Sequence, residues 1–347
     1  IEELKRSSIS STKDDAYQLS EGEQSEYIIG PQHSDTQALI SATKELMEYR
    51  RQYTPSVQIR ESRVTYNKEQ RYYITSRETA LFSSVGSYEA VVLVVAQEGT
   101  HSSGLSYTVG NTESLTDSPI YEKFEIAEVL NNAKAFVHTQ SLADKFTGDV
   151  ILTPNAVESL LTWLLGQVSE MSLLNGSSVL KYNVEELIAS PLLNIHSTVK
   201  PCGHAPFTND GFVKQPSTLV KKGRLLRLLP NHYGARKLGV PYQPTASTEW
   251  SVASGEEKLE NMIASVEKGA LVDRLSMGLP SANGDFSGVI KSSFYIENGN
   301  KKHTLSEVMI SGNIGDMLQN IVAVSQESVD YGNTVRPWLQ IKGVHFS

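Results

Sequence analysis

The sequence lacks the residues and patterns that define several large classes of protein. It contains one cysteine in 347 residues, Cys202, so neither an intramolecular disulfide framework nor a four-cysteine zinc site can form. Its longest apolar stretches, residues 91–96 and 160–165, are far shorter than the roughly 20 residues that span a membrane. No apolar segment suited to a signal peptide follows Ile1. These absences predict a soluble, cytoplasmic protein without a membrane partner.

The sequence also has fewer basic than acidic residues. Lysine and arginine number 31 against 39 aspartates and glutamates, which gives a formal net charge of −8. Because nucleic-acid binding requires a basic face, we expect no direct nucleic-acid partner. The glycine-rich phosphate motifs GxxxxGK[ST] and GxGxxG are absent as well, so nothing in the sequence supports nucleotide-dependent chemistry.

The first part of the chain, residues 1–146, has the mixed pattern of an N-terminal α/β domain. Its first roughly 35 residues are polar and are predicted to be weakly ordered. The domain therefore resembles a shortened one. Hydrophobic periodicity then predicts a helix over 35–49, alternating strands over 57–74, a buried strand over 88–97, a glycine- and serine-rich turn over 101–111 and a helix over 119–138.

The remainder, residues 147–347, is predicted to be a β-rich C-terminal domain. A short strand at 150–152 leads into Thr153-Pro154, which opens a helix that is apolar on nearly every side and runs to about Leu174. The later pattern predicts strands over 218–229, 294–296 and 304–310 and helices over 255–268 and 314–324. The predicted fold class is therefore α+β, with a barrel- or sandwich-like C-terminal domain.

One loop carries residue types that bind metals. His196, Cys202 and His204 follow one another in the spacing H-x5-C-x-H, and imidazole and thiolate are good zinc ligands. The spacing matches no standard structural-zinc signature, and loop histidines and a lone cysteine commonly have no such role. The sequence leaves both interpretations open.

Several collinear motifs resemble those of the TldD/PmbA family, whose members are often labelled modulators of DNA gyrase. The resemblance runs from about Thr36 to the C-terminus and is strongest between Thr147 and Met317. The motifs that carry it are Thr147–Pro154, Thr208–Gly211, Lys222–Leu225, Asn231–Gly239, Asn283–Gly288, Ile296–Gly299 and Glu307–Met317.

The resemblance also shows where this chain departs from the catalytic branch of the family. TldD-type members are metallopeptidases with HExxxH on the helix after the boundary strand and a cysteine near the C-terminus. Here Thr162 and Gln167 stand at the two histidines and Trp163 at the glutamate, and residues 328–344 contain no cysteine. Threonine and glutamine are poor zinc ligands and tryptophan cannot act as a general base.

The chain is therefore similar to the PmbA (TldE) branch, which lacks the zinc motif. The resemblance implies a non-catalytic subunit, without a cofactor of its own, that supports the proteolysis of unfolded peptides by a TldD-type zinc protease. Two alternatives remain: a self-sufficient metallopeptidase with a displaced zinc site at His196, Cys202 and His204, and a homodimeric module that binds peptides or another protein. The sequence gives no physical reason for an action on DNA gyrase: its acidic balance speaks against direct contact with DNA, and a contact between proteins stays open.

Three groups of turn residues are candidates for a peptide-binding surface. Turn residues of these types most often have a structural role, through side chains that bond their own backbone. The spacing around Ser287, G-x-x-S-G, differs from that of a nucleophile elbow, so no catalytic residue is predicted. The candidates are Asn209, Asp210, Gly211, Gly284, Asp285, Ser287, Gly312 and Asn313.

Overall fold

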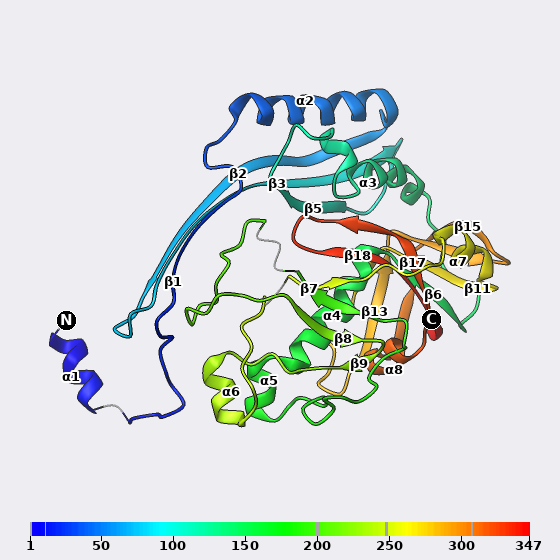
Figure 1. Cartoon of the computed structure of the whole chain (residues 1–347). Helices are drawn as coiled ribbons and strands as arrows, with labels where there is room; N and C mark the ends of the chain where they lie inside the picture. The colour runs from blue at the N-terminus through cyan, green and yellow to red at the C-terminus, as the bar shows by residue number, and fades with distance from the viewer. Residues whose placement is uncertain (1, 11, 199–201, 247–248, 307) are drawn as a thin grey trace.

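A computed structural model of the chain describes residues 2–10, 12–198, 202–246, 249–306 and 308–347. A helix-covered N-terminal sheet lies above a larger C-terminal body, and a ribbon of long strands curves down beside that body (Figure 1). The combination of helices with largely antiparallel sheets confirms the predicted α+β class.

The N-terminal sheet is organised around its longest strand, β3 (Ala80–Glu98). Strand β2 (Val57–Ile74) pairs with it in antiparallel fashion along one edge. The other edge is shared by three strands, β1 (Gln24–Ile29), which is parallel to β3, β4 (His101–Ser102) and β5 (Ser106–Thr112). Part of the polar lead-in, predicted to be weakly ordered, thus forms a paired strand.

Helix α2 (Thr36–Tyr53) covers this sheet and buries Ala38, Ala42 and Leu46. As the sequence predicts, the helix begins after Asp35, whose carboxylate accepts a hydrogen bond from the amide of Ala38 at 2.9 Å. The remaining N-terminal helices are α1 (Glu2–Ser10), α3 (Ile126–Ala133) and two short 3₁₀ turns, η1 (Ile120–Glu122) and η2 (Lys134–Val137).

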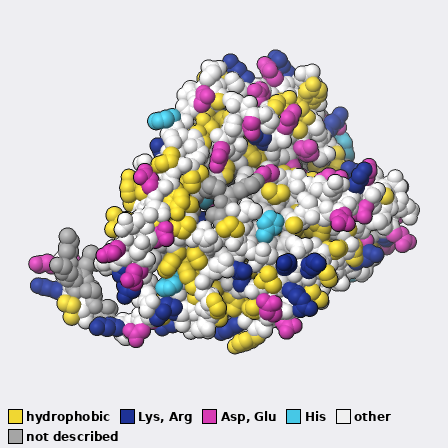
Figure 2. Space-filling view, in the orientation of Figure 1, with side chains coloured by type: hydrophobic (Ala, Val, Ile, Leu, Met, Phe, Trp, Pro, Cys, Tyr) yellow, Lys and Arg dark blue, Asp and Glu magenta, His cyan; other side chains and the backbone are white. Residues whose placement is uncertain are grey.

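The far end of the β1–β3–β2 ribbon forms an arm, which we define as residues 24–29, 66–74 and 80–88. Tyr72 at its end is 68% exposed, and hydrophobic side chains are visible along the arm in Figure 2. The arm contacts the body where the ring of Tyr73 lies against Gly211. A Cβ atom there would lie 1.9 Å from the ring, and the residue has a φ of 77°, so only glycine fits.

The body is built on a nine-stranded sheet that curls into a half-barrel. Strands β6 and β11 are parallel and the other neighbours antiparallel. In spatial order the strands are β12 (Arg274–Ser276), β13 (Asp285–Lys291), β16 (Met309–Asn313), β18 (Val335–Phe346), β6 (Phe146–Leu152), β11 (Lys268–Val272), β14 (Ser293–Glu297) and β15 (Asn300–Leu305), with β17 (Ile321–Asp330) also paired to β18.

Helix α4 (Pro154–Val168) packs against strands β6, β12 and β18 of this sheet. The hydroxyl of Thr153 accepts a hydrogen bond from the amide of Ala156, and Pro154 occupies the first turn, where its missing N–H costs nothing. Leu160, Leu164 and Val168 are almost fully buried in the largest hydrophobic core.

Smaller elements complete the body. A second sheet has the order β10-β7-β8-β9. Its strands and the remaining helices are β7 (Ile195–Ser197), β8 (Ser217–Lys221), β9 (Arg224–Leu225), β10 (Ser251–Val252), α5 (Glu170–Asn175), α6 (His232–Leu238), α7 (Leu259–Ser265) and α8 (Ile314–Gln319). None of the described helices combines the length and the apolar character needed to cross a membrane.

The strand predicted over 88–97 begins earlier, at Ala80, and the strands predicted over 57–74 form the single strand β2. Three further predicted elements of the first 175 residues are also wrong in extent or continuity. The predicted turn over 101–111 is mostly strand, because β5 pairs with β3. The predicted helix over 119–138 is interrupted at Phe124 and Glu125, which have φ values of 56° and 60°. The predicted helix from Pro154 to Leu174 divides at Ser169, whose backbone is extended.

Later elements are also shorter than predicted. The strand over 218–229 is a hairpin, since Lys222 and Gly223 have positive φ and reverse the chain between β8 and β9. The strand over 304–310 is likewise divided between β15 and β16, with Glu307 outside the described residues. The helices predicted over 255–268 and 314–324 end at Ser265 and Gln319, where β-strands follow.

The buried face of α4 yields a stability prediction. Replacing Leu164, which has no exposed surface, with alanine leaves a cavity in the core, and we expect a loss of about 2–5 kcal/mol in the free energy of unfolding. Thr162→Ala on the exposed face should change it by less than about 0.5 kcal/mol. Urea denaturation of both variants measures the difference, and equal losses would contradict the packing described here.

Candidate functional site

The three positions that correspond to a zinc motif on α4 do not face the same way. Thr162 is exposed, whereas Trp163 and Gln167 are buried. Residues five apart on a helix are separated by about 140° around its axis, so the side chains of Thr162 and Gln167 diverge. Threonine, tryptophan and glutamine at these positions do not fit a zinc site.

Trp163 and Gln167 instead hold a turn of the chain against α4. The indole N–H of Trp163 donates to the carbonyl of Ser281 at 3.3 Å. The amide of Gln167 donates to the carbonyl of Ala282 at 2.9 Å and accepts from the amide N–H of Val179 at 2.8 Å. The polar groups of both side chains are therefore used in hydrogen bonds within the chain. The turn at residues 281–284 packs against them.

The structure brings together five of the predicted peptide-binding residues at this turn. Asp285 is opposite Asn313 in the register of β13 and β16; Gly312 is opposite Phe286, the next residue of β13, and Ser287 follows Phe286. Asn313 donates to the carboxylate of Asp285 at 2.9 Å, and this bond with one from Asn283 holds the pKa of Asp285 below its usual range. A Cβ atom on Gly284 would lie 3.0 Å from the Trp163 ring.

The other three candidates, Asn209, Asp210 and Gly211, lie where the arm meets the body. Asn209 accepts a hydrogen bond from Arg71 of β2 at 3.1 Å. Asp210 accepts one from the backbone N–H of His232 at the start of α6, at 3.2 Å. The two groups of candidates thus form separate clusters, one over α4 and one against the arm.

A cavity of about 520 Å³ opens between the arm and the body, and we call it the arm cavity. It receives side chains from the arm, from the end of α4 and from the irregular segments of the body. Its principal lining residues are Glu69, Arg71, Leu165, Ser169, His204, Asn209, Asp210, Lys214, Asn231, Tyr242 and Glu249.

A buried ion pair lines the arm cavity. The Lys214 ammonium lies 3.1 Å from Oε1 of Glu249, and the two side chains are only 10% and 2% exposed. His204 lies at 3.9 Å from the same oxygen. Burial raises the pKa of the nearby Tyr242 hydroxyl to about 12, so it stays protonated at neutral pH.

A second cavity of about 510 Å³, the α4 cavity, lies at the other end of the helix and is lined by Glu158, Ser159 and Thr162. Arg274 stacks on the ring of Tyr107 at 3.4 Å and donates to that residue's carbonyl, which joins the cavity wall to the N-terminal sheet. Asp273 beside it has a pKa raised by burial.

One face of α4 connects these two cavities. Glu158 and Thr162 line the α4 cavity, while Leu165 and Ser169 line the arm cavity. The spacings of four and three residues place Glu158, Thr162 and Leu165 on one stripe of the helix, and Ser169 is the cap residue directly after its last turn; we call these four residues the α4 stripe. Eleven residues of helix rise about 16 Å, the length of about five residues of extended chain. The stripe has the dimensions of a short peptide-binding surface.

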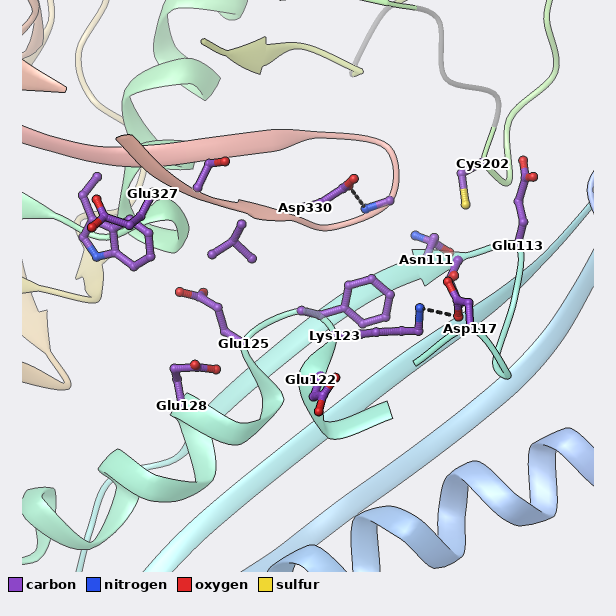
Figure 3. Close-up of a pocket in the computed structure, with 16 residues that line it drawn as sticks. Asn111, Glu113, Asp117, Glu122, Lys123, Glu125, Glu128, Cys202, Glu327 and Asp330 are labelled. Atoms are coloured by element: carbon purple, nitrogen blue, oxygen red, sulfur yellow. Dashed lines mark hydrogen bonds and ion pairs between the residues drawn. The ribbon is translucent and has the colours of Figure 1, made fainter. Parts of the chain in front are cut away.

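A third cavity, about 710 Å³ in volume, lies beside the β17–β18 hairpin, and we call it the acidic cavity. Figure 3 shows carboxylates on opposite sides of it, with Glu125 and Glu128 across from Asp330. Burial raises the pKa of Glu125 to about 7, although the Tyr331 hydroxyl donates to this carboxylate at 2.6 Å. Its one lysine, Lys123, is paired with Asp117 at 2.8 Å.

The histidines and cysteine singled out as zinc ligands are not gathered by the fold. His196 lies in β7, Cys202 is buried at the acidic cavity, and His204 contacts Asn333 at 3.2 Å. Over the part of the chain that the structure describes, no three histidine, cysteine, aspartate or glutamate side chains are placed to hold a metal.

Sequence reasoning singled out Asn209, Asp210 and His204 of the arm cavity, but it missed the charged residues Arg71, Lys214 and Glu249. Lys214 and Glu249 are 35 residues apart in segments without periodicity, and Arg71 comes from a strand in the other half of the chain. A glutamate directly before Trp250, a fully buried residue, is the one local signal of a buried carboxylate.

Comparison with known proteins places this site in a family. Residues 146–347, more than half of the chain, match the family model described as the PmbA/TldA metallopeptidase C-terminal domain. The chain therefore belongs to the PmbA/TldD metallopeptidase family, which confirms the resemblance found in the sequence.

Two relatives illustrate the similarity. The chain is 26% identical over 262 residues to metalloprotease PmbA of Escherichia coli O157:H7, which covers 72% of this chain and 57% of that protein. It is 24% identical over 278 residues to a zinc metalloprotease TldD homolog of Saccharolobus solfataricus, which covers 74% of this chain and 61% of that protein. The chain thus spans little more than half the length of these relatives.

Solved structures share the fold. TldE from Thermococcus kodakarensis matches with a TM-score of 0.81 at 17% identity, over 100% of this chain and 83% of that one. A Thermotoga maritima protein described as a candidate modulator of a DNA gyrase matches with a TM-score of 0.79 at 17% identity, with the same coverage.

The hydrogen bonds of Gln167 yield a prediction. Gln167→Met keeps the size of the side chain but leaves the Ala282 carbonyl and the Val179 N–H without their partner. We expect a loss of about 1–3 kcal/mol in the free energy of unfolding. Thr162→Ala on the exposed face of the same helix is the control. An unchanged stability in Gln167→Met, measured by urea denaturation, would show that the turn does not depend on this side chain.

Glu125 yields a pH dependence. Its folded pKa of about 7 exceeds the ordinary value of 4.5, so the folded state binds the proton more tightly. The contribution of Glu125 to stability is therefore full below pH 4.5 and is lost as the pH rises through about 7, by about 2–3 kcal/mol between pH 5 and pH 8. Glu125→Gln should remove this component in urea denaturation at both pH values. A variant with the same pH dependence as the original chain would refute this role.

Proposed function

We propose that this chain is a non-catalytic, peptide-binding subunit of a cytoplasmic proteolytic assembly, in which a TldD-type zinc protease supplies the metal. The observation that carries the proposal is the state of the zinc-motif positions. Trp163 and Gln167 are buried and hydrogen-bonded to the turn at Ser281 and Ala282, and Thr162 alone faces a cavity. A protein with this helix needs a partner for hydrolysis.

The α4 stripe supports a role in holding peptide. It offers a stretch about five extended residues long, with cavities for side chains at both ends. A peptide held there in extended form could also pair its main chain with a sheet edge, which tolerates many sequences. Unfolded segments of proteins are the substrates that such a surface suits best.

The partner in this proposal is a TldD-type chain, and self-association is the alternative pairing. The arm is the surface we propose for either contact, because its exposed side chains include Ile28, Tyr72 and Ile74. A homodimeric binding module without protease is the competing function. No observation on the described residues favours a displaced zinc site at His196, Cys202 and His204.

Reconstitution tests the proposal. Fluorescein-labelled casein is incubated with this chain alone, with the TldD-type chain of the same genome alone, and with both. We expect no hydrolysis by this chain alone, and hydrolysis by the pair several-fold faster than by the TldD-type chain alone, because this subunit holds the substrate. A TldD-type chain with glutamine at the motif glutamate is the inactive control.

Two results would contradict the proposal. Chelator-sensitive hydrolysis by this chain alone would make it a self-sufficient metallopeptidase. The absence of any effect on the TldD-type chain, together with a homodimer that binds casein, would favour the binding module.

A further inference from the structure

Glu249 is a buried carboxylate with unused hydrogen-bonding capacity. Its side chain is 2% exposed, and only Oε1 has partners, the Lys214 ammonium at 3.1 Å and the His204 ring at 3.9 Å. Oε2 is buried and has no hydrogen-bond partner among the described residues. An ionised carboxylate offers about four acceptor sites, so most of this group's capacity is unfilled.

An unfilled buried acceptor is costly to the folded protein. Desolvation removes the water that would otherwise bond to it, and the pairing with Lys214 repays this only in part. A donor brought by a ligand would recover the loss. A complex in which a ligand donates a hydrogen bond to Glu249 is therefore stabilised relative to the free chain.

The charges of the arm cavity favour a positive donor. Three carboxylates line it, from Glu69, Asp210 and Glu249, against two cations, Arg71 and Lys214. Both cations are already paired, Arg71 with Glu69 at 2.8 Å and Lys214 with Glu249. With these two pairs formed, the surplus negative charge lies on Asp210, and among the described lining residues an incoming anion would find no unpaired lysine or arginine.

The cavity also offers surroundings that suit an alkylammonium or guanidinium group. Tyr242 lines it, and its ring, to which cations are attracted in general, also contacts the rings of Phe212 and His232. His204 is 40% exposed, so it lies at the more open side of the buried pair. Asn209 also lines the cavity, and its side-chain oxygen accepts a hydrogen bond from Arg71.

We infer that the arm cavity is a subsite for a cationic group of an extended peptide, which donates to Glu249. The cation is the peptide's free amino terminus or the side chain of a lysine or arginine. This inference rests on the proposed peptide-binding function and deepens it. Because Leu165 and Ser169 join this cavity to the α4 stripe, a cation fixed at Glu249 sets which peptide residues lie beside Thr162.

Three fluorescent octapeptides of alanine, serine and glycine test the inference against the purified full chain. One has a free amino terminus and no lysine, one is N-acetylated with a central lysine, and one is N-acetylated without lysine. Fluorescence anisotropy titrations should show the first or the second peptide binding about tenfold more tightly than the neutral third, the gain expected for a charge-assisted hydrogen bond. The peptide that binds more tightly identifies the source of the cation, the amino terminus in the first peptide or the lysine side chain in the second.

Glu249→Gln should abolish the advantage of the cationic peptide and leave the neutral one unchanged. Because this variant leaves Lys214 buried without its counter-ion, the double variant Glu249→Gln with Lys214→Met provides a second test in a neutral cavity. Glu128→Gln, which removes a carboxylate from the acidic cavity, is the matched control and should retain the full preference.

The outcomes separate the two proposals. If all three peptides bind equally to the original chain, the cationic subsite is wrong and the peptide-binding function stands. A preference that survives in both Glu249 variants also overturns the subsite. If no peptide binds, both the subsite and the peptide-binding function fail.

Discussion

The structure depends on the burial of one apolar helix. Leu160, Leu164 and Val168 give α4 no wide polar face, so it is stable only when a sheet encloses it. The half-barrel supplies that enclosure, and the turn at Ser281–Asp285 closes over another side through Trp163 and Gln167. What remains accessible is the α4 stripe, so the two cavities at its ends are consequences of how this helix is packed.

The long strands of the N-terminal half have a related consequence. Because β2 and β3 continue well beyond the part covered by α2, their ends reach the body, and Arg71 and Tyr73 contact the loop that contains Asn209 and Gly211. The wall of the arm cavity is thus assembled from two distant parts of the sequence. A ligand there would touch both, which couples peptide binding to the position of the arm.

Local signals predicted the parts of the fold that local forces decide. Thr153 caps α4 as expected, and the alternation over 57–74 forms β2. The segment at 101–111 was misjudged because its pairing with β3 is a tertiary contact, and the helix break at Phe124 comes from the packing of its ring beside Gly110. Long-range pairing overrode local preference at both places.

The candidate site likewise has features that the sequence shows and contacts that it does not show. The sequence identified the altered zinc-motif positions, because each is visible as a residue type at a fixed spacing. It could not show that Gln167 bonds to Ala282, nor that Lys214 pairs with Glu249, since neither contact has a sequence pattern. The measurement that tests the central claim most directly is zinc per chain in protein purified without chelator. The account predicts a value near zero, because Trp163 and Gln167 on α4 bond to the turn and bind no metal. A value near one zinc per chain would contradict the account.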